Sequence, residues 1–356
     1  MSRRRKLHTE GSTRGLDRRD ALACGVVSAL ALAGLGCGSA QPPVERDVLP
    51  PTRPDRHVAR LTDIVSAVGL EWLFVLRPAE LMSLSWLRPS LSRVLRDERL
   101  DALAQATNLD LRVLPEIVLA GHRSPNADGS GSVFFVVRHE GDSAELERKF
   151  RERLTGDAER REIGHQLLGV WGRLGRQERA YVAAGRNVAG YQYDGSRARG
   201  AARIALLHAE GRLSANTAAS NDPDVLALEL RLGAAPARGY WLGPFDGPAS
   251  RGARGLLGGA TSAGLAMQPT SEGTLALTVR LQGAYAGTNA LTPLADAFQD
   301  LAASDLGHLL GLGSPRSPAR VEEDAEGLRL LVDLDAHALL AGIAAATLES
   351  VREFMR

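Results

Sequence analysis

The sequence predicts an α+β protein with two successive modules, each an antiparallel sheet with helices packed on one face. Short apolar runs separated by turn residues are typical of antiparallel strands, and apolar residues spaced three and four apart predict helices. Strands and helices alternate in the ferredoxin-like order. The order in residues 58–213 recurs in residues 214–356, which suggests an internal duplication.

The first module, residues 58–213, opens with a strand at residues 70–76, stopped by Arg77-Pro78. Asp142 is expected to begin a helix, with Glu145 in the capping-box position. The other expected elements are a helix through Leu91, Val94, Leu95 and Leu103, strands at 116–120, 132–138, 166–171, 180–184 and 188–193, and a closing helix at 196–208.

The second module, residues 214–356, begins with a small, polar stretch that reads as a linker. We expect Thr292 to cap a helix with Pro293 in its first turn, and Asp335 to cap a final helix. The remaining expected elements are strands at 225–232, 262–268 and 274–281, a Gly-rich connection ending at Gly259, and a hairpin of residues 321–323 and 328–334.

The N-terminal residues predict export. Arginines precede an uncharged run at residues 21–35, which is too short for an ordinary transmembrane helix and typical of a secretory signal peptide. Arg18, Arg19 and Leu22 make the leader resemble a twin-arginine signal, while a Sec route stays open.

The end of this run, Gly36-Cys37, resembles a bacterial lipobox, whose cysteine becomes the lipid-carrying first residue of the mature protein. This predicts a signal peptide at residues 1–36, followed by the lipidated cysteine and a Pro-rich tether at 37–57. The alternative is ordinary cleavage after Ala40, which would release a soluble periplasmic or secreted protein.

Composition excludes several classes of function. The only cysteines are Cys24 and Cys37, so a mature chain starting at Cys37 has no disulfide or protein-thiolate metal site in its body. Lys plus Arg number 43 and Asp plus Glu 42, and aromatic residues make up only 4%, which argues against a nucleic-acid partner. We expect no metal or other cofactor, and the only expected partners are a membrane, through the lipid, and an envelope protein.

Motifs for common catalytic chemistry are absent from the sequence: there is no His-Glu-x-x-His, Gly-x-Ser-x-Gly, phosphate loop or dinucleotide fingerprint. The weak candidate site is Asp333, Asp335 and His337, whose alternate spacing could serve a metal or acid–base chemistry. The competing interpretation is an outward-facing strand residue, a helix cap and a first-turn histidine.

Three other stretches contain groups that could bind a metal ion or another ligand. The first, with Asn126, Asp128, Ser130 and Gly131, mimics the start of a calcium loop but has Val137 where the bidentate carboxylate belongs. The second, an acidic run of Glu322, Glu323, Asp324 and Glu326, is typical of a solvated turn. The third, the Gly-rich stretch 239–264, is either a ligand loop or an irregular connection whose aromatics cover a sheet edge.

Together these features predict an exported, lipid-anchored cell-envelope protein with a non-enzymatic binding or structural role and no catalytic residue. Two alternatives stay open. One is an envelope hydrolase with a dispersed acid–base site, which requires carboxylates and histidines from several elements to meet in one cleft. The other is a carrier or sensor, which requires a cavity for an apolar ligand between sheet and helices.

Overall fold

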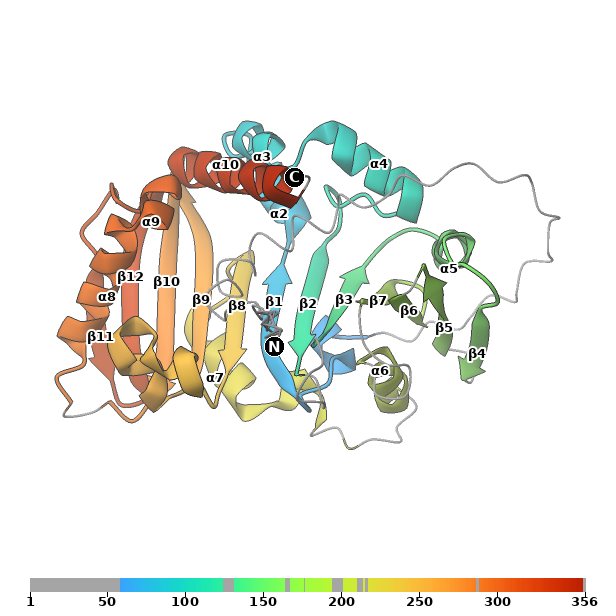
Figure 1. Ribbon diagram of the computed structural model, residues 1–356, viewed down its shortest axis with the longest axis horizontal. Coiled ribbons are helices and arrows are strands. Elements are labelled where there is room, and N and C mark those ends of the chain that lie inside the picture. Colours follow the sequence, from blue (N-terminus) through green and yellow to red (C-terminus); the bar gives the residue numbers. More distant parts are fainter. Residues whose placement is uncertain are drawn as a thin grey trace, which may run out of the picture.

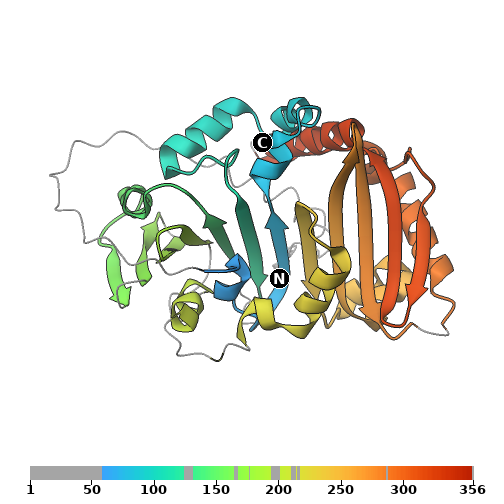
Figure 2. The ribbon, with the colours of Figure 1, turned by 180° about the vertical axis from the view of Figure 1, so that it is seen from behind.

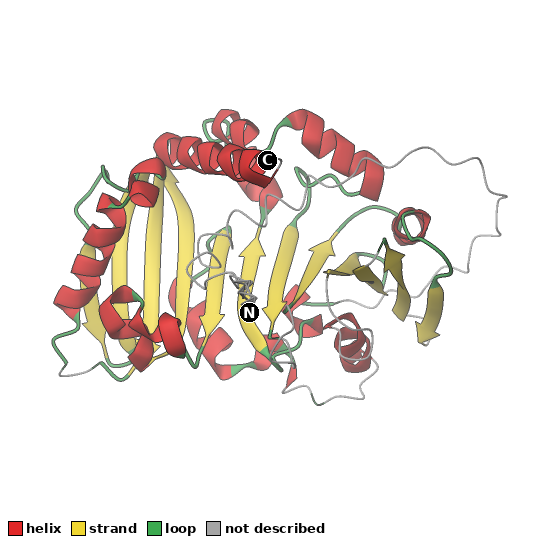
Figure 3. Cartoon of the chain, viewed as in Figure 1, coloured by secondary structure: helices red, strands yellow, loops and turns green. Residues whose placement is uncertain are grey.

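The predicted α+β class is confirmed by the computed structural model (Figures 1 and 3). It describes residues 58–123, 131–163, 167–175, 177–193, 201–209, 214, 217–285 and 288–354. The leader and tether, with Arg18, Arg19, Leu22 and Cys37, lie outside the described residues. None of the described helices is long and apolar enough to span a membrane.

The centre of the fold is one 12-stranded antiparallel sheet with the order β11-β12-β10-β9-β8-β1-β2-β3-β7-β6-β5-β4. Strands from residues 58–213 form one side and strands from residues 214–356 the other, and they join where β1 pairs with β8. The strands are β1 Leu70–Leu76, β2 Glu116–His122, β3 Ser132–Arg138, β4 Glu159–Ile163, β5 Leu167–Leu174, β6 Gln177–Ala184, β7 Val188–Tyr193, β8 Ala237–Leu242, β9 Ala260–Ser271, β10 Thr274–Gly283, β11 Arg320–Asp324 and β12 Gly327–Asp335.

The order of elements after the two central strands is similar. A helical excursion, the hairpin β2–β3, a helix, further strands and a closing helix follow β1, and the same order follows β8 with the hairpin β9–β10. The helical elements are η2 Leu61–Ile64, α2 Pro78–Ser83, α3 Arg88–Val94, α4 Asp97–Thr107, α5 Ser143–Glu152, α6 Ala201–Ala209, η4 Ala219–Asn221, α7 Pro223–Leu232, η5 Gly247–Arg251, η6 Ala253–Gly259, α8 Leu291–Ala303, α9 Asp305–Leu309 and α10 Ala336–Phe354.

Helices cover both faces of the sheet, which corrects the expectation of a single covered face. Residues of η2, α6, η4 and α7 join one apolar core with the side chains of one face. On the other face, α5 packs on the first half of the sheet, while α3, α8 and α10 pack on the second half. Figures 1 and 2 show the sheet from its two sides, with α8 in front in the first view and α7 in front in the second. Alternating side chains on the strands are therefore buried on both faces.

The strand expected at residues 225–232 is wrong, because these residues form α7. Asp222 caps this helix by accepting hydrogen bonds from the backbone N–H groups of Asp224 and Val225, at 3.0 and 3.1 Å. Proline at position 223 occupies the first turn, where its missing N–H costs nothing. The cap and the proline therefore fix a helix start in what was expected to be a linker.

The Gly-rich stretch 239–264 is neither a loop nor an edge cover. Its first residues belong to β8, which lies near the middle of the sheet, and its last belong to β9. Tyr240 is fully buried, and two short 3-10 helices, η5 and η6, fill most of the connection. The aromatic residues of this stretch thus pack in or against the apolar core.

The single helix expected through Leu91, Val94, Leu95 and Leu103 is wrong, because the backbone is extended at Leu95 and Arg96 and divides it into α3 and α4. Most of the remaining element predictions agree with the structure within a few residues at their ends. The hairpins β2–β3 and β11–β12 form as expected, and Asp142 caps α5 by accepting a 2.9 Å hydrogen bond from the backbone N–H of Ala144. The helix α8 begins at Leu291 with Ala290 as its N-cap, so Thr292 lies in the first turn and is not the cap.

Candidate functional site

The weak candidate site does not assemble. Asp333 accepts a 2.9 Å hydrogen bond from the hydroxyl of Ser317. Asp335 binds Arg316 at 2.6 Å and caps α10 by accepting a 2.9 Å bond from the backbone N–H of Ala338. The hydrogen bond from Arg316 is the main cause of a lowered pKa for Asp335. Each carboxylate is thus engaged with its own local partner.

His337 faces a different element. Its Nδ1 lies 2.7 Å from the hydroxyl oxygen of Ser90 on α3, and its ring lies edge-on to Trp86 at 6.4 Å. A serine paired with a histidine is the arrangement of an activated nucleophile, but Ser90 is only 4% exposed. A substrate therefore has no access to this hydroxyl, and the pair reads as a contact between helices.

The acidic run is also structural. Asp324 accepts a hydrogen bond from the buried Arg280, which lowers the pKa of Asp324, while Glu326 pairs with Arg231 of α7. Within the described ranges, no group of three or more His, Cys, Asp or Glu side chains could hold a metal ion. Of the calcium-like stretch, Asn126, Asp128 and Ser130 fall outside the described residues.

A pocket lies between the first half of the sheet and the helices α4 and α5. Its volume is about 90 Å³ and it is partly open to solvent. An engineered apolar cavity of about 150 Å³ admits a benzene molecule, so this space suits a short hydrocarbon group. The lining is mostly apolar and comes from α4 and the loop after it, α5, and strands β2, β3 and β5–β7: Leu103, Thr107, Leu109, Leu111, Leu119, Phe135, Phe150, Arg153, Leu154, Leu174, Arg179, Tyr191, Gln192 and Tyr193.

Tyr191 contributes a buried polar group to this lining. The residue is 7% exposed, and its hydroxyl has no hydrogen-bond partner among the described residues. Its neighbour Tyr181, whose ring lies 5.3 Å away, donates a 3.3 Å hydrogen bond to the carbonyl oxygen of Ser143. An unsatisfied buried hydroxyl costs about 1–3 kcal/mol, so a ligand that accepts from Tyr191 would recover part of that cost.

Positive charge lies beside the two tyrosines of β7. Burial raises the pKa of Tyr191 well above its usual value, with Tyr181 and Tyr193 adding to the effect and Arg153 opposing it. Burial also raises the pKa of Tyr193, against the opposing charges of Arg153 and Arg179. The guanidinium of Arg179 lies over the Tyr193 ring, 5.2 Å from its centre. Both hydroxyls therefore stay protonated near neutral pH and can donate.

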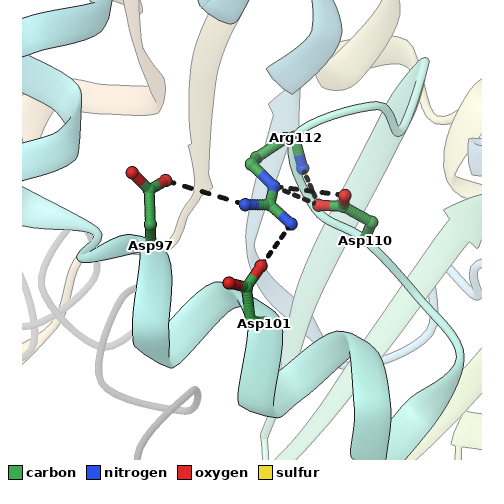
Figure 4. A network of polar contacts seen from close by, with 4 residues as sticks. All are labelled: Asp97, Asp101, Asp110 and Arg112. Carbon is green, nitrogen blue, oxygen red and sulfur yellow. Dashed lines mark hydrogen bonds and ion pairs between the residues drawn. The ribbon is translucent and has the colours of Figure 1, made fainter.

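A charged cluster holds α4 in place beside the pocket (Figure 4). Arg112 binds Asp110 through Nε at 2.8 Å and Asp101 through Nη2 at 2.6 Å, and its Nη1 lies 3.6 Å from Asp97. Asp97 and Asp101 lie on α4, while Arg112 and Asp110 lie in the loop that follows it. Because α4 and this loop supply four of the lining residues, the cluster positions one wall of the pocket.

A second, more polar hollow of about 370 Å³ lies at the same end of the sheet. Its lining includes Trp171, Arg173 and Glu178, and it shares Arg179 and Gln192 with the apolar pocket. Half of its lining residues are charged, and most of these charged side chains are exposed to solvent. We therefore take the apolar pocket as the candidate site.

Part of this site can be predicted from local sequence patterns. The spacing of Phe150 and Leu154 is that of residues on one face of a helix, and the alternation in β7 places Tyr191 and Tyr193 on one face of the strand. Sequence reasoning missed the pocket itself, because α4, α5 and β7 meet only in the folded chain. No family model, curated protein sequence or solved structure matches this chain.

Proposed function

We propose that this chain is an exported, lipid-anchored cell-envelope protein that binds a small ligand with an apolar part in the pocket between the sheet, α4 and α5. The observation that carries the binding role is the buried Tyr191 hydroxyl without a partner in the described chain, set in an apolar pocket. Binding sites for small molecules are typically apolar hollows with few polar groups, which fix the ligand's orientation.

A binding role fits the chemistry better than hydrolysis. A dispersed hydrolase needs an acid, a base and an accessible nucleophile or water in one cleft. In the described chain Asp333 and Asp335 are engaged with separate partners, and the hydroxyl that faces His337 is buried. The part of the pocket lining that the structure describes contains two tyrosines and two arginines, and no carboxylate or histidine to act as a general base near neutral pH.

The envelope location rests on the leader. The run that ends in Gly36-Cys37, the Pro-rich residues 38–57 and the cysteine-free remainder are what a lipoprotein with a tethered body would carry. The membrane, through the lipid on Cys37, would then be the first partner, and an envelope protein a second.

Intact mass and detergent partition of the expressed chain test the anchor. We expect a diacyl or triacyl mass beginning at Cys37, which partitions into detergent and is lost in Cys37→Ala. A lipid-free chain beginning at Gln41 in the wild type would refute the anchor and indicate a soluble periplasmic or secreted protein.

Titration with 1-hexanol, followed by ligand-observed NMR, tests the pocket. Leu111→Phe adds volume to the lining and should weaken binding at least about fivefold, because overpacking removes the space a ligand needs. The matched control is Leu230→Phe, at a leucine on α7 that is 80% exposed. Equal hexanol binding by Leu111→Phe and the wild type, with unchanged melting temperatures, would contradict the assignment.

A further inference from the structure

We infer that the ligand is an amphiphile with a carboxylate head, which Arg153 and the hydroxyls of Tyr191 and Tyr193 bind while its hydrocarbon part occupies the apolar pocket. This inference rests on the proposed binding function and adds the chemical class of the ligand.

Arg153 differs from the arginines of α5 in its partners. Arg148 pairs with Glu145 and Glu152 of the same helix, and Arg151 lies 3.9 Å from Glu147. Arg153, which caps the C-terminus of α5, has no side-chain partner in the described part of the chain, although it lines the pocket. A guanidinium presents five N–H donors and no acceptor, and its geometry matches a carboxylate.

Two tyrosine hydroxyls accompany Arg153 in the pocket. The hydroxyl of Tyr191 is buried without a partner in the described residues, and Tyr193, two positions along the same strand, also lines the pocket. Burial raises the pKa of both groups, so they present O–H donors and not phenolates. Two hydroxyl donors and a cation select an oxygen that accepts hydrogen bonds and carries negative charge.

The charges of the lining disfavour cationic and neutral head groups. Among the described residues no Asp or Glu lines the pocket, while Arg153 and Arg179 both do, so an ammonium group would meet like charge without a counterion from these residues. A neutral alcohol would satisfy a tyrosine hydroxyl but would leave the charge of Arg153 unused. The volume of about 90 Å³ limits the buried part to a short chain or branch.

Three six-carbon probes that differ only in the head group test this inference on the full chain carrying Cys37→Ala, which removes the competing lipid. We expect hexanoate to bind about tenfold more tightly than 1-hexanol by NMR titration, with hexylamine weakest, because a charge-assisted pair adds about 1.4 kcal/mol or more. Binding of hexanoate should also weaken as the salt concentration rises.

Matched variants then assign the head-group site. Arg153→Gln should reduce the ratio of hexanoate to hexanol affinity to about one, and Arg153→Lys should restore part of it. Arg151→Gln, two residues away on the same helix, should keep the full ratio. Tyr191→Phe should weaken hexanoate binding several-fold, whereas Tyr181→Phe, whose hydroxyl already donates to Ser143, should not.

The outcomes separate this inference from the pocket itself. Equal binding of hexanoate and hexanol, or tighter binding of hexylamine, would overturn the carboxylate head while leaving the pocket in place. An unchanged ratio in Arg153→Gln would overturn the role of Arg153. Failure of all three probes to bind the chain carrying only Cys37→Ala would overturn both the head group and the proposed binding function.

Discussion

Ser90 on α3 and His337 on α10 lie 2.7 Å apart, between the hydroxyl oxygen and Nδ1, and so link the two halves of the chain. Ser90 is buried, whereas His337 is exposed to solvent. The cost of breaking the pair should therefore depend on which partner is removed.

Removing His337 should destabilise the fold more than removing Ser90. Ser90→Ala leaves the histidine free to hydrate and should cost about 1 kcal/mol, while His337→Ala leaves a buried hydroxyl unpaired and should cost about 1–3 kcal/mol. Urea denaturation of both single variants and the double variant measures the order and the coupling. Ser83→Ala, at a serine that donates only to the nearby carbonyl of Glu80, is the control. Equal costs for the two single variants would contradict the asymmetry.

Arg112 should stabilise the wall of the pocket in a pH-dependent way. Burial raises the pKa of Asp110, but the hydrogen bonds from Arg112 outweigh it and leave that pKa below the ordinary value of 3.8. A carboxyl with a lowered pKa in the folded state stabilises the fold above its unfolded pKa, and this contribution is lost as the pH falls through the folded value.

Arg112→Gln should therefore cost about 1 kcal/mol at pH 7, since the pairs are partly exposed, and the difference from wild type should shrink below about pH 4. Urea denaturation at pH 7, 5 and 3 measures this change. Arg123→Gln, which removes a single pair to Glu71, is the comparison. A difference that stayed constant with pH would mean that the guanidinium acts through packing and not through charge.

Much of the fold could be predicted where a local signal and the folded environment agree. The hairpin of residues 116–120 and 132–138 follows from alternation and turn residues, and the start of α5 follows from Asp142. Similarly, Asp335 was expected to cap the last helix, and it does.

The error at residues 225–232 has a physical cause. Leucines at 226, 228, 230 and 232 alternate as in a strand, but the helix buries Val225, Leu228 and Leu232 and leaves Leu226 and Leu230 exposed by 40% and 80%. The cap at Asp222 therefore decides the structure against the apolar pattern. Pairing of β1 with β8 and closure of the pocket depend on residues far apart in the chain, which no local pattern encodes.

Gly327 should be intolerant of a side chain because it starts β12 at a tight turn. Its φ is +153°, and an added Cβ would lie 2.0 Å from the carbonyl oxygen of Leu281. Gly327→Ala should therefore cost more than about 3 kcal/mol. Gly175 also has a positive φ, of +62°, but a Cβ added there would meet no atom within 4 Å. Gly175→Ala should therefore cost only about 1 kcal/mol. Thermal melting of both variants, compared with the wild type, measures the difference, and equal losses would show that the backbone can move away at Gly327.

Charged residues on the edge strand β11 should keep the sheet from pairing with a second molecule. This strand lies at one end of the sheet, and Glu323 on it is exposed. An exposed edge offers unpaired backbone groups, and charged side chains hinder the approach of another strand. Glu323→Val should therefore increase self-association, measured by light scattering over a concentration series, whereas Glu98→Val, at an exposed position of α4, should not. If both variants stayed monodisperse, the protection would lie in the backbone twist of the edge and not in its charge.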